Sequence, residues 1–214
     1  PAKAGLMMIP MMVGLIGTST GVGFIIARTG NYKIYPIIGL AITAGALFWM
    51  SHLTVETSLM QLGCEFLVFG IGLGMVIQVL VLIVQNSFPL SQVGTATAAN
   101  NFFRQIGSAL GASLVGSMFI HNMKDEMATR MPEAFQKMGP EGAAYAEKFG
   151  DADGGANSLT PDLVASFPQP IEEAILNSYN DGLTPVIALM VPLAIVALLL
   201  LLPLRQERLK ETIN

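Results

Sequence analysis

The 214-residue chain has little of what secreted, metal-binding or strongly charged proteins use. It contains a single cysteine, Cys64, which excludes an internal disulfide framework and any metal site built from several cysteines. Charged residues make up only 12% of the chain, whereas 52% of the residues are hydrophobic. This balance is typical of an integral membrane protein.

Short catalytic and nucleotide-binding motifs are also absent. The sequence has no G-x-x-x-x-G-K-[ST] loop to cradle phosphates, no G-x-S-x-G nucleophile turn and no H-E-x-x-H zinc motif. Its two histidines, His52 and His121, have no partner at a ligand spacing. We therefore expect no metal site, no cofactor and no ATP hydrolysis.

Acidic and basic residues are unevenly distributed. Residues 121–178 hold ten of the fifteen acids but only four of the eleven bases, so this segment carries a charge of −6 and the rest of the chain +2. No basic face exists that would neutralise phosphates, which argues against a nucleic-acid partner.

Long apolar blocks dominate what is present. Five segments have about the 20 apolar residues needed to cross a hydrocarbon core of roughly 30 Å. They are residues 5–27, 34–51, 59–84, 95–120 and 179–204. Lipid offers no hydrogen-bond partners to an open strand, so the predicted fold class is an all-α integral membrane protein with five transmembrane helices.

Lysine and arginine in the short connections predict the orientation of these spans. The connection between the first two spans carries Arg28 and Lys33 and no acid, and residues 205–214 form a second basic segment. Five spans place both on the same side, which the positive-inside rule makes cytoplasmic. Residues 121–178 are then expected to form an extracytoplasmic acidic loop with amphipathic helices, in a multi-pass protein of the cytoplasmic membrane.

Glycines recur at helical spacing on three of the spans. Small residues three or four positions apart allow two helix backbones to approach closely, so these positions are predicted to pack against other helices. They are Gly14, Gly17, Gly21, Gly70, Gly74, Gly107 and Gly111.

The third span also carries polar side chains that would be costly in lipid. Gln78 and Gln85 continue the glycine stripe, whereas Glu65 falls on the opposite face. Two interpretations follow: the helix is buried on both faces, or Glu65 lies close enough to the outer interface to reach water.

Arg104 lies near the middle of the fourth span, about 15 Å along the helix axis from its start. An arginine at that depth costs about 2.5 to 3.5 kcal/mol, so it needs a partner or water. It either meets a transported anion or a carboxylate, or it is a structural arginine bonded to a neighbouring helix end. Asn100 and Asn101 lie on the same stripe.

The connection GFIIARTGNYK resembles a signature of the major facilitator superfamily, G-x-x-x-[D]-R-x-G-[basic], through Gly23, Arg28, Gly30 and Lys33. Ala27 stands where the first copy of that signature has an acid, as in the degenerate second copy of the carboxyl-terminal half. The resemblance implies a cytoplasmic hinge that helps to lock the inward-closed state.

The stretch FGIGLGMVIQVLVLIVQNSFPLSQVGTATAANNFFRQIGSALGASLVGS, with the acidic insertion after it, resembles the 14-span EmrB/QacA drug:proton antiporter subfamily. The resemblance implies that the chain is a fragment, the last five spans of a transporter, forming most of its carboxyl-terminal bundle. The amino-terminal half, with the subfamily's antiporter signature and its acidic coupling residues, would then be missing.

The resemblance implies proton-coupled export of lipophilic, often cationic drugs by alternating access. Glu65 is the proton-coupling candidate because it is the one acid beyond the first turn of an apolar span. Gln78, Gln85, Asn100, Asn101 and Arg104 are candidates for the substrate cavity. The expected partners are the lipid bilayer, a small-molecule substrate, protons and the amino-terminal half, and a periplasmic adaptor is neither indicated nor excluded.

Two alternatives remain open. The first is an exporter of an anionic metabolite with Arg104 as the partner of the anion. The second is an integral-membrane enzyme that uses Glu65 and a histidine as acid and base, which the isolation of these residues in the sequence disfavours.

Overall fold

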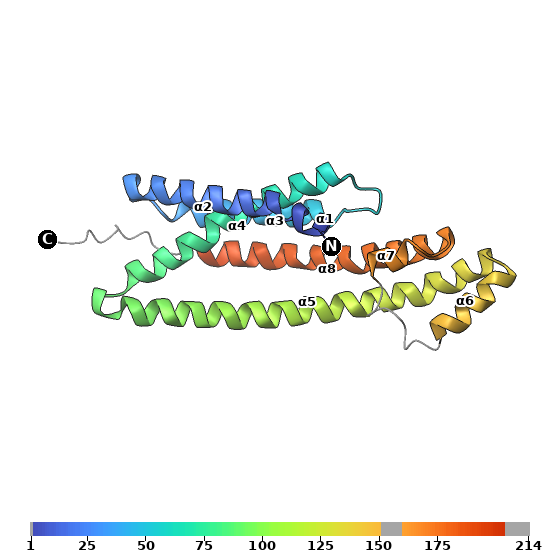
Figure 1. The fold of residues 1–214 in the computed structure, drawn as a ribbon. Helices are drawn as coiled ribbons and strands as arrows, with labels where there is room; N and C mark the ends of the chain where they lie inside the picture. The colour runs from blue at the N-terminus through green and yellow to red at the C-terminus, as the bar shows by residue number, and fades with distance from the viewer. Residues whose placement is uncertain (1, 151–159, 204–214) are drawn as a thin grey trace. The chain divides into compact units, whose positions relative to one another are not determined.

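The computed structural model describes residues 2–150 and 160–203, and within them the regular structure is helical (Figure 1). The elements are α1 (Ala2–Met7), α2 (Ile9–Thr29), α3 (Ile34–Met50), α4 (Leu59–Ser87), the 3-10 turn η1 (Leu90–Gln92), α5 (Val93–Lys137), α6 (Pro140–Gly150), α7 (Pro161–Val164) and α8 (Gln169–Leu201). The chain divides into two compact units. Unit 1 consists of Pro1–His52, Thr57–Gly111 and Ile187–Asn214, and unit 2 of Leu53–Glu56 and Ala112–Val186.

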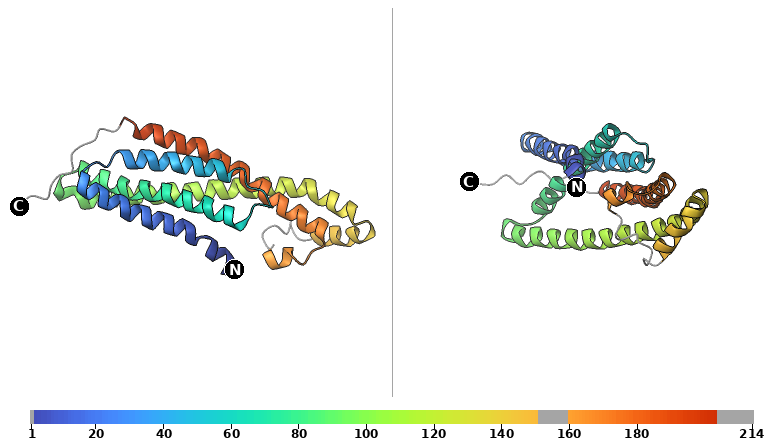
Figure 2. Two further views of the ribbon diagram at one scale, coloured as in Figure 1. Left: turned by 90° about the horizontal axis from the view of Figure 1, so that it is seen from above. Right: turned by 45° about the vertical axis from the view of Figure 1, so that its right-hand side comes forward.

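In unit 1, α4 packs against α2 through glycine backbones, and the views of Figures 1 and 2 show these helices as neighbours. A Cβ added to Gly74 would lie 2.5 Å from the carbonyl oxygen of Leu15, and Gly70 meets the backbone of Met11 even more closely. On α2, a Cβ added to Gly14 would lie 2.6 Å from a carbonyl oxygen of α4. No side chain fits at these points, so the two backbones touch directly.

The opposite face of α4 packs equally closely against α3. A Cβ added to Gly39 would lie 2.8 Å from the carbonyl oxygen of Gly72, and one added to Gly72 would collide with Thr43. The Thr43 hydroxyl donates to the Gly39 carbonyl at 2.8 Å, so its polar group is satisfied within α3. Helix α4 is therefore buried on both faces, which is the first of the two interpretations that its sequence allowed.

The carboxyl-terminal part of α8 completes unit 1. Ile187 and Ala194 of α8 form a buried apolar cluster with Ala44 and Leu47 of α3, and Phe69 of α4 packs against it. These residues are apolar and close-packed, so the cluster stabilises unit 1 by dispersion.

The connection between α2 and α3 is a tight turn closed by glycine. Gly30 has a φ of 68°, the left-handed conformation that glycine adopts without strain, and its N–H donates to the carbonyl of Ile26 at 2.8 Å. Tyr32 is buried just beyond it, in an apolar cluster with Val22, Ile26 and Val79. The side chain of Asn86, at the far end of α4, donates to the Tyr32 hydroxyl at 3.5 Å.

Two helices run from a predicted span into the segment where amphipathic helices were expected. Helix α5 does not end near residue 120 but continues to Lys137, and α8 begins at Gln169 rather than at residue 179. Charged residues change where a helix can sit relative to lipid, but pairs four apart such as Glu126 and Arg130 favour continuation of the helix. The expected acidic segment is thus largely helical in its described part, and these helices are continuous with the predicted spans. The basic tail at residues 205–214 lies outside the described residues.

Unit 2 has its own apolar core, built from the apolar faces of its helices. Met123, Met127 and Met131 recur four residues apart on α5 and pack with Ile171 and Ile175 of α8. Gly182 approaches the backbone of α5, since a Cβ there would lie 2.9 Å from the amide nitrogen of Met123. The flexible methionine side chains fill the space between the two helices.

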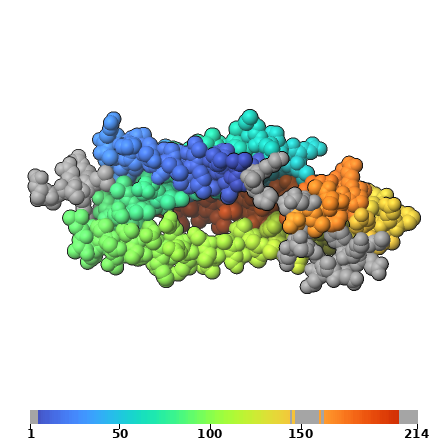
Figure 3. Space-filling view, viewed as in Figure 1, coloured from blue at the N-terminus to red at the C-terminus, as the bar shows by residue number. Residues whose placement is uncertain are grey.

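Three of the described helices are long and apolar enough to cross a membrane: Gly5–Thr29, Leu59–Ser87 and Gln169–Leu201. Helix α3 is apolar but has 17 residues, and α5 is not among the three because asparagine, glutamine and arginine interrupt its apolar part. Spans within α3 and α5 stay predictions. Figure 3 shows α2 at the surface of unit 1, where exposed side chains such as Val13, Ile16 and Phe24 suit contact with lipid.

Candidate functional site

Glu65 is fully buried, in the second turn of α4. Ser58 caps this helix by accepting a hydrogen bond from the N–H of Gln61 at 3.2 Å. The side chain of Gln61 then reaches one turn forward, and its Nε2 donates to Oε1 of Glu65 at 3.0 Å. A carboxyl group and an amide are thus paired inside the apolar part of the chain.

The second carboxyl oxygen of Glu65, Oε2, is buried and has no hydrogen-bond partner within the described residues. None of the ion pairs in this part of the chain involves Glu65 either. An ionised carboxylate without a cation or donors is costly to bury, and such an exception in a folded protein calls for an explanation.

The two glutamines of α4 lie well away from Glu65. Gln85 follows it by 20 residues, which is about 30 Å along a helix axis. Its Nε2 donates to the hydroxyl of Thr97 at 3.2 Å, and this contact joins the end of α4 to the start of α5. Gln78 is exposed.

The polar residues of α5 form a local pair. Arg104 is exposed, and its guanidinium donates to Oδ1 of Asn101 at 3.2 Å, one turn earlier on the helix. Asn100 is half-buried. Among the described residues Arg104 makes no ion pair with an acid. Its charge is thus left available to a group outside the described residues.

The candidate residues do not converge on one site. Glu65 lies near the beginning of α4, whereas Gln85 lies near its end and Arg104 about 10 Å beyond Thr97 along α5. The histidines are engaged elsewhere: His52 contacts the carbonyl of Phe48 at 2.8 Å, and His121 lies 3.4 Å from Asp125. Within unit 1, Glu65 and His52 therefore do not form the acid-base pair that an enzyme would need.

The residues of the predicted hinge have distinct places. Gly30 closes α2 in the left-handed conformation, and Lys33 immediately precedes α3. Arg28 is exposed in the last turn of α2, where a cation favours the negative end of the helix dipole. Gly23 is half-buried within α2, and a Cβ added there would meet nothing within 4 Å among the described residues.

The predicted packing glycines fall into two groups. Gly14, Gly70 and Gly74 lie at the contact between α2 and α4. A Cβ on any of the others would meet nothing within 4 Å in the described part of the chain; these are Gly17, Gly21, Gly107 and Gly111. The same spacing thus marks a contact in one case and an open surface in the other.

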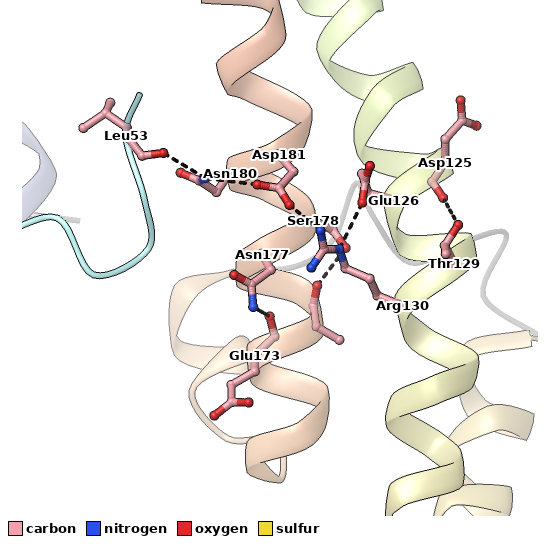
Figure 4. A network of polar contacts seen from close by, with 11 residues as sticks. Leu53, Asp125, Glu126, Thr129, Arg130, Glu173, Asn177, Ser178, Asn180 and Asp181 are labelled. Atoms are coloured by element: carbon pink, nitrogen blue, oxygen red, sulfur yellow. Dashed lines mark hydrogen bonds and ion pairs between the residues drawn. The ribbon is translucent and has the colours of Figure 1, made fainter. Parts of the chain in front are cut away.

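A polar network in unit 2 had not been anticipated from the sequence. Arg130 donates to Glu126 at 3.0 Å on its own helix and to Asp181 of α8 (Figure 4). The other oxygen of Asp181 accepts from Asn180 at 3.2 Å, and the same Asn180 amide donates to the carbonyl of Leu53 at 3.0 Å. The spacing of Glu126 and Arg130 could have indicated their pair, but no local pattern relates Arg130 to Asp181, 51 residues away.

The long apolar helices, the direct backbone contacts between them and the buried polar groups define a multi-pass membrane protein. The model of the Major Facilitator Superfamily matches residues 2–112, more than half of the chain. The chain belongs to this superfamily of membrane transporters, whose members are not enzymes.

Similar proteins are transporters and resistance proteins. An uncharacterized MFS-type transporter of Mycobacterium tuberculosis is 31% identical over 97% of this chain and 28% of its own length. A tetracycline resistance determinant of Streptomyces rimosus is 36% identical over 55% of this chain and 34% of its own length. A multidrug transporter protein of Bacillus subtilis is 25% identical over 82% of this chain and 33% of its own length. The chain thus spans about a third or less of each of these relatives.

Proposed function

We propose that the chain is the carboxyl-terminal part of a proton-coupled exporter of lipophilic, often cationic compounds, of the 14-span EmrB/QacA type. The similarity to a multidrug transporter and to a tetracycline resistance determinant supports export of drugs. The remaining spans of the transporter would supply the other half of the substrate cavity, and the two halves would rock to open it alternately to each side. The orientation follows from Arg28 and Lys33, which favour a cytoplasmic α2–α3 connection.

The observation that carries proton coupling is the buried carboxyl group of Glu65. Coupling requires an acid that binds and releases a proton as its surroundings change. Glu65 has one free oxygen and no counter-charge among the described residues. A sodium ion would need several oxygen ligands, whereas the neighbour of Glu65 presents an N–H donor to it. A proton requires only one oxygen, so it fits this site better.

An anion exporter is the second candidate. Arg104 is exposed and carries no acidic partner among the described residues, so it would be free to pair with the anionic group of a substrate. In that case the substrate cavity would select anionic metabolites instead of cationic drugs.

Ethidium efflux from cells that express the complete transporter separates these proposals. The parent protein is compared with Glu65→Gln, Arg104→Ala and Glu56→Gln at matched membrane abundance, with and without a collapsed proton gradient. Glu56 is exposed in the α3–α4 connection, so its substitution controls for the loss of any glutamate charge.

We expect gradient-dependent efflux in the parent and in Glu56→Gln, and at least a tenfold loss in Glu65→Gln. Full efflux in Glu65→Gln would exclude this residue as the coupling site. A folded parent that exports no ethidium would overturn the cationic-drug assignment, and loss of organic-anion efflux in Arg104→Ala would then establish the second candidate.

A further inference from the structure

The only polar contact of the Glu65 carboxyl group within the described residues is the amide of Gln61. An amide side chain is both a donor, through its NH₂ group, and an acceptor, through its carbonyl oxygen. A carboxylate only accepts hydrogen bonds, whereas a carboxylic acid also donates one. A primary amide is therefore one of few side chains that can pair with both protonation states of a glutamate.

We propose that Gln61 is the positioning residue of the coupling site, paired with Glu65 in both of its protonation states. The inference rests on the proposed function, in which Glu65 binds and releases the coupled proton. In the ionised state Gln61 donates from Nε2 to Oε1 of Glu65, which is the contact in the structure. When a proton forms an O–H bond at Oε1, rotation of the amide by half a turn presents its carbonyl oxygen as the acceptor. The proton comes from hydronium, whose O–H bond breaks and which leaves as water, and the charge of the carboxylate is lost. The N–H···Oε1 hydrogen bond is replaced by an O–H···O bond to the amide oxygen.

The local sequence supports this role because Gln61 departs from the usual use of its position. Ser58-Leu59-Met60-Gln61 matches the capping box S-x-x-Q, in which the glutamine side chain turns back to the N–H of the capping serine. The serine half of the box is formed, since its hydroxyl accepts from the N–H of Gln61 at 3.2 Å. The glutamine side chain instead points forward to Glu65. Its amide therefore forms a hydrogen bond with the buried acid and does not cap the helix.

Burial makes the pairing important for Glu65. The glutamate is completely buried and Gln61 half-buried, so water does not replace the amide freely. Without Gln61 both carboxyl oxygens would be unsatisfied among the described residues, which is costly for either protonation state. The amide lowers this cost in both states, and so the proton can be exchanged without a large change in stability.

Two substitutions of Gln61 in the complete transporter test the proposal. Gln61→Leu keeps the size and the helix propensity but pairs with neither protonation state. Gln61→Lys supplies donors and a positive charge, so it pairs with the carboxylate alone. Both keep the backbone N–H that caps α4. Gln136→Leu, at an exposed position of α5, is the control for replacing a glutamine by leucine.

Difference infrared spectroscopy of the purified protein during acidification reports the carbonyl band of protonated Glu65, identified by its absence in Glu65→Gln. We expect this band to move to higher frequency in Gln61→Leu, because the carbonyl environment loses its hydrogen-bonding amide, and to appear only at lower pH in Gln61→Lys. In ethidium efflux, Gln61→Leu should lower the maximal rate about tenfold and leave the half-saturating ethidium concentration unchanged. Gln61→Lys should move the pH of half-maximal efflux down by about one unit or more.

An unchanged carbonyl band and an unchanged pH profile in both variants would overturn the role of Gln61. Failure of the role of Gln61 can be distinguished from failure of the coupling role of Glu65. If Glu65→Gln keeps full efflux while the band still responds to Gln61, the pair exists but Glu65 is not the coupling residue. If Glu65→Gln loses efflux and the Gln61 variants behave like Gln136→Leu, Glu65 couples without this partner.

Discussion

The contact between α2 and α4 makes a sharp prediction about Gly74. Replacing Gly74 by alanine adds a Cβ that would lie 2.5 Å from the carbonyl oxygen of Leu15 and 3.2 Å from its carbonyl carbon and Cα. Ordinary van der Waals contact begins at 3.4 Å, so the two backbones must separate by about 0.9 Å. Both contacting groups belong to helix backbones, which cannot turn away as a long side chain can.

The magnitude follows from two opposing effects. Overpacking a close contact typically costs about 1 to 3 kcal/mol, whereas alanine gains up to about 1 kcal/mol over glycine through its helix propensity. We therefore expect Gly74→Ala to destabilise the protein by up to about 2 kcal/mol. Gly17→Ala is the matched control on α2, since a Cβ there would meet nothing within 4 Å among the described residues, and it should be neutral or slightly stabilising.

Thermal stability of the purified complete transporter in detergent tests this reasoning. Samples are heated and then passed over a size-exclusion column. The measured midpoint is the temperature at which the monodisperse peak falls to half of its unheated area. Gly74→Ala should have the lower midpoint and Gly17→Ala the same midpoint as the parent or a higher one. Equal midpoints for the two variants would show that the backbones do not touch at Gly74, and the close packing of α4 would have to be abandoned.

Two further predictions concern helix ends and the polar network. Arg130→Gln and Asp181→Asn should each lower the stability of the unit 2 helices by about 0.5 to 1 kcal/mol, and the double variant by less than the sum of the two. Hydrogen exchange of these helices in the complete protein measures the three losses. Strict additivity would mean that the pair contributes nothing to stability. Ser58→Ala removes the cap of α4 and should speed hydrogen exchange in the first turn by about fivefold, for a loss near 1 kcal/mol, whereas Ser91→Ala, at an exposed serine of η1, should leave that turn unchanged. Unchanged exchange in Ser58→Ala would contradict the capping contact.

The sequence predicted the all-helical fold because lipid-compatible composition and segment length leave helices as the only choice. It also predicted the glycine stripe of α4 but left the burial of Glu65 open. The second contact face depends on Gly72 and Gly39, which the stripe at four-residue spacing did not include. Helical periodicity identifies a face that can pack, but only the arrangement of neighbouring helices decides how many faces are used.

Other features were not predictable from local patterns for physical reasons. Amphipathic helices were expected after position 120, but not that one of them would be continuous with the fourth predicted span. A helix backbone satisfies its own hydrogen bonds in water as in lipid, so α5 continues to Lys137. The pairing of Arg130 with Asp181 depends on how α5 and α8 pack in unit 2, through the methionines of one helix and the isoleucines of the other. Gly17 and Gly107 have the same spacing signal as Gly74, but the described residues place no atom against them.

The packing of α4 restricts how the proposed coupling can work. Helix α4 touches the backbone of α2 at Gly70 and Gly74 and that of α3 at Gly72, so sliding or rotation against either helix would drive backbone atoms into each other. The three helices must therefore move as one body, which agrees with the rocking of whole bundles and disfavours the displacement of a single helix. Glu65 lies on this body and not at a joint within it. In the proposed coupling, a change in its protonation therefore changes the charge of a site buried inside this body, with Gln61 keeping the carboxyl group in place in either state.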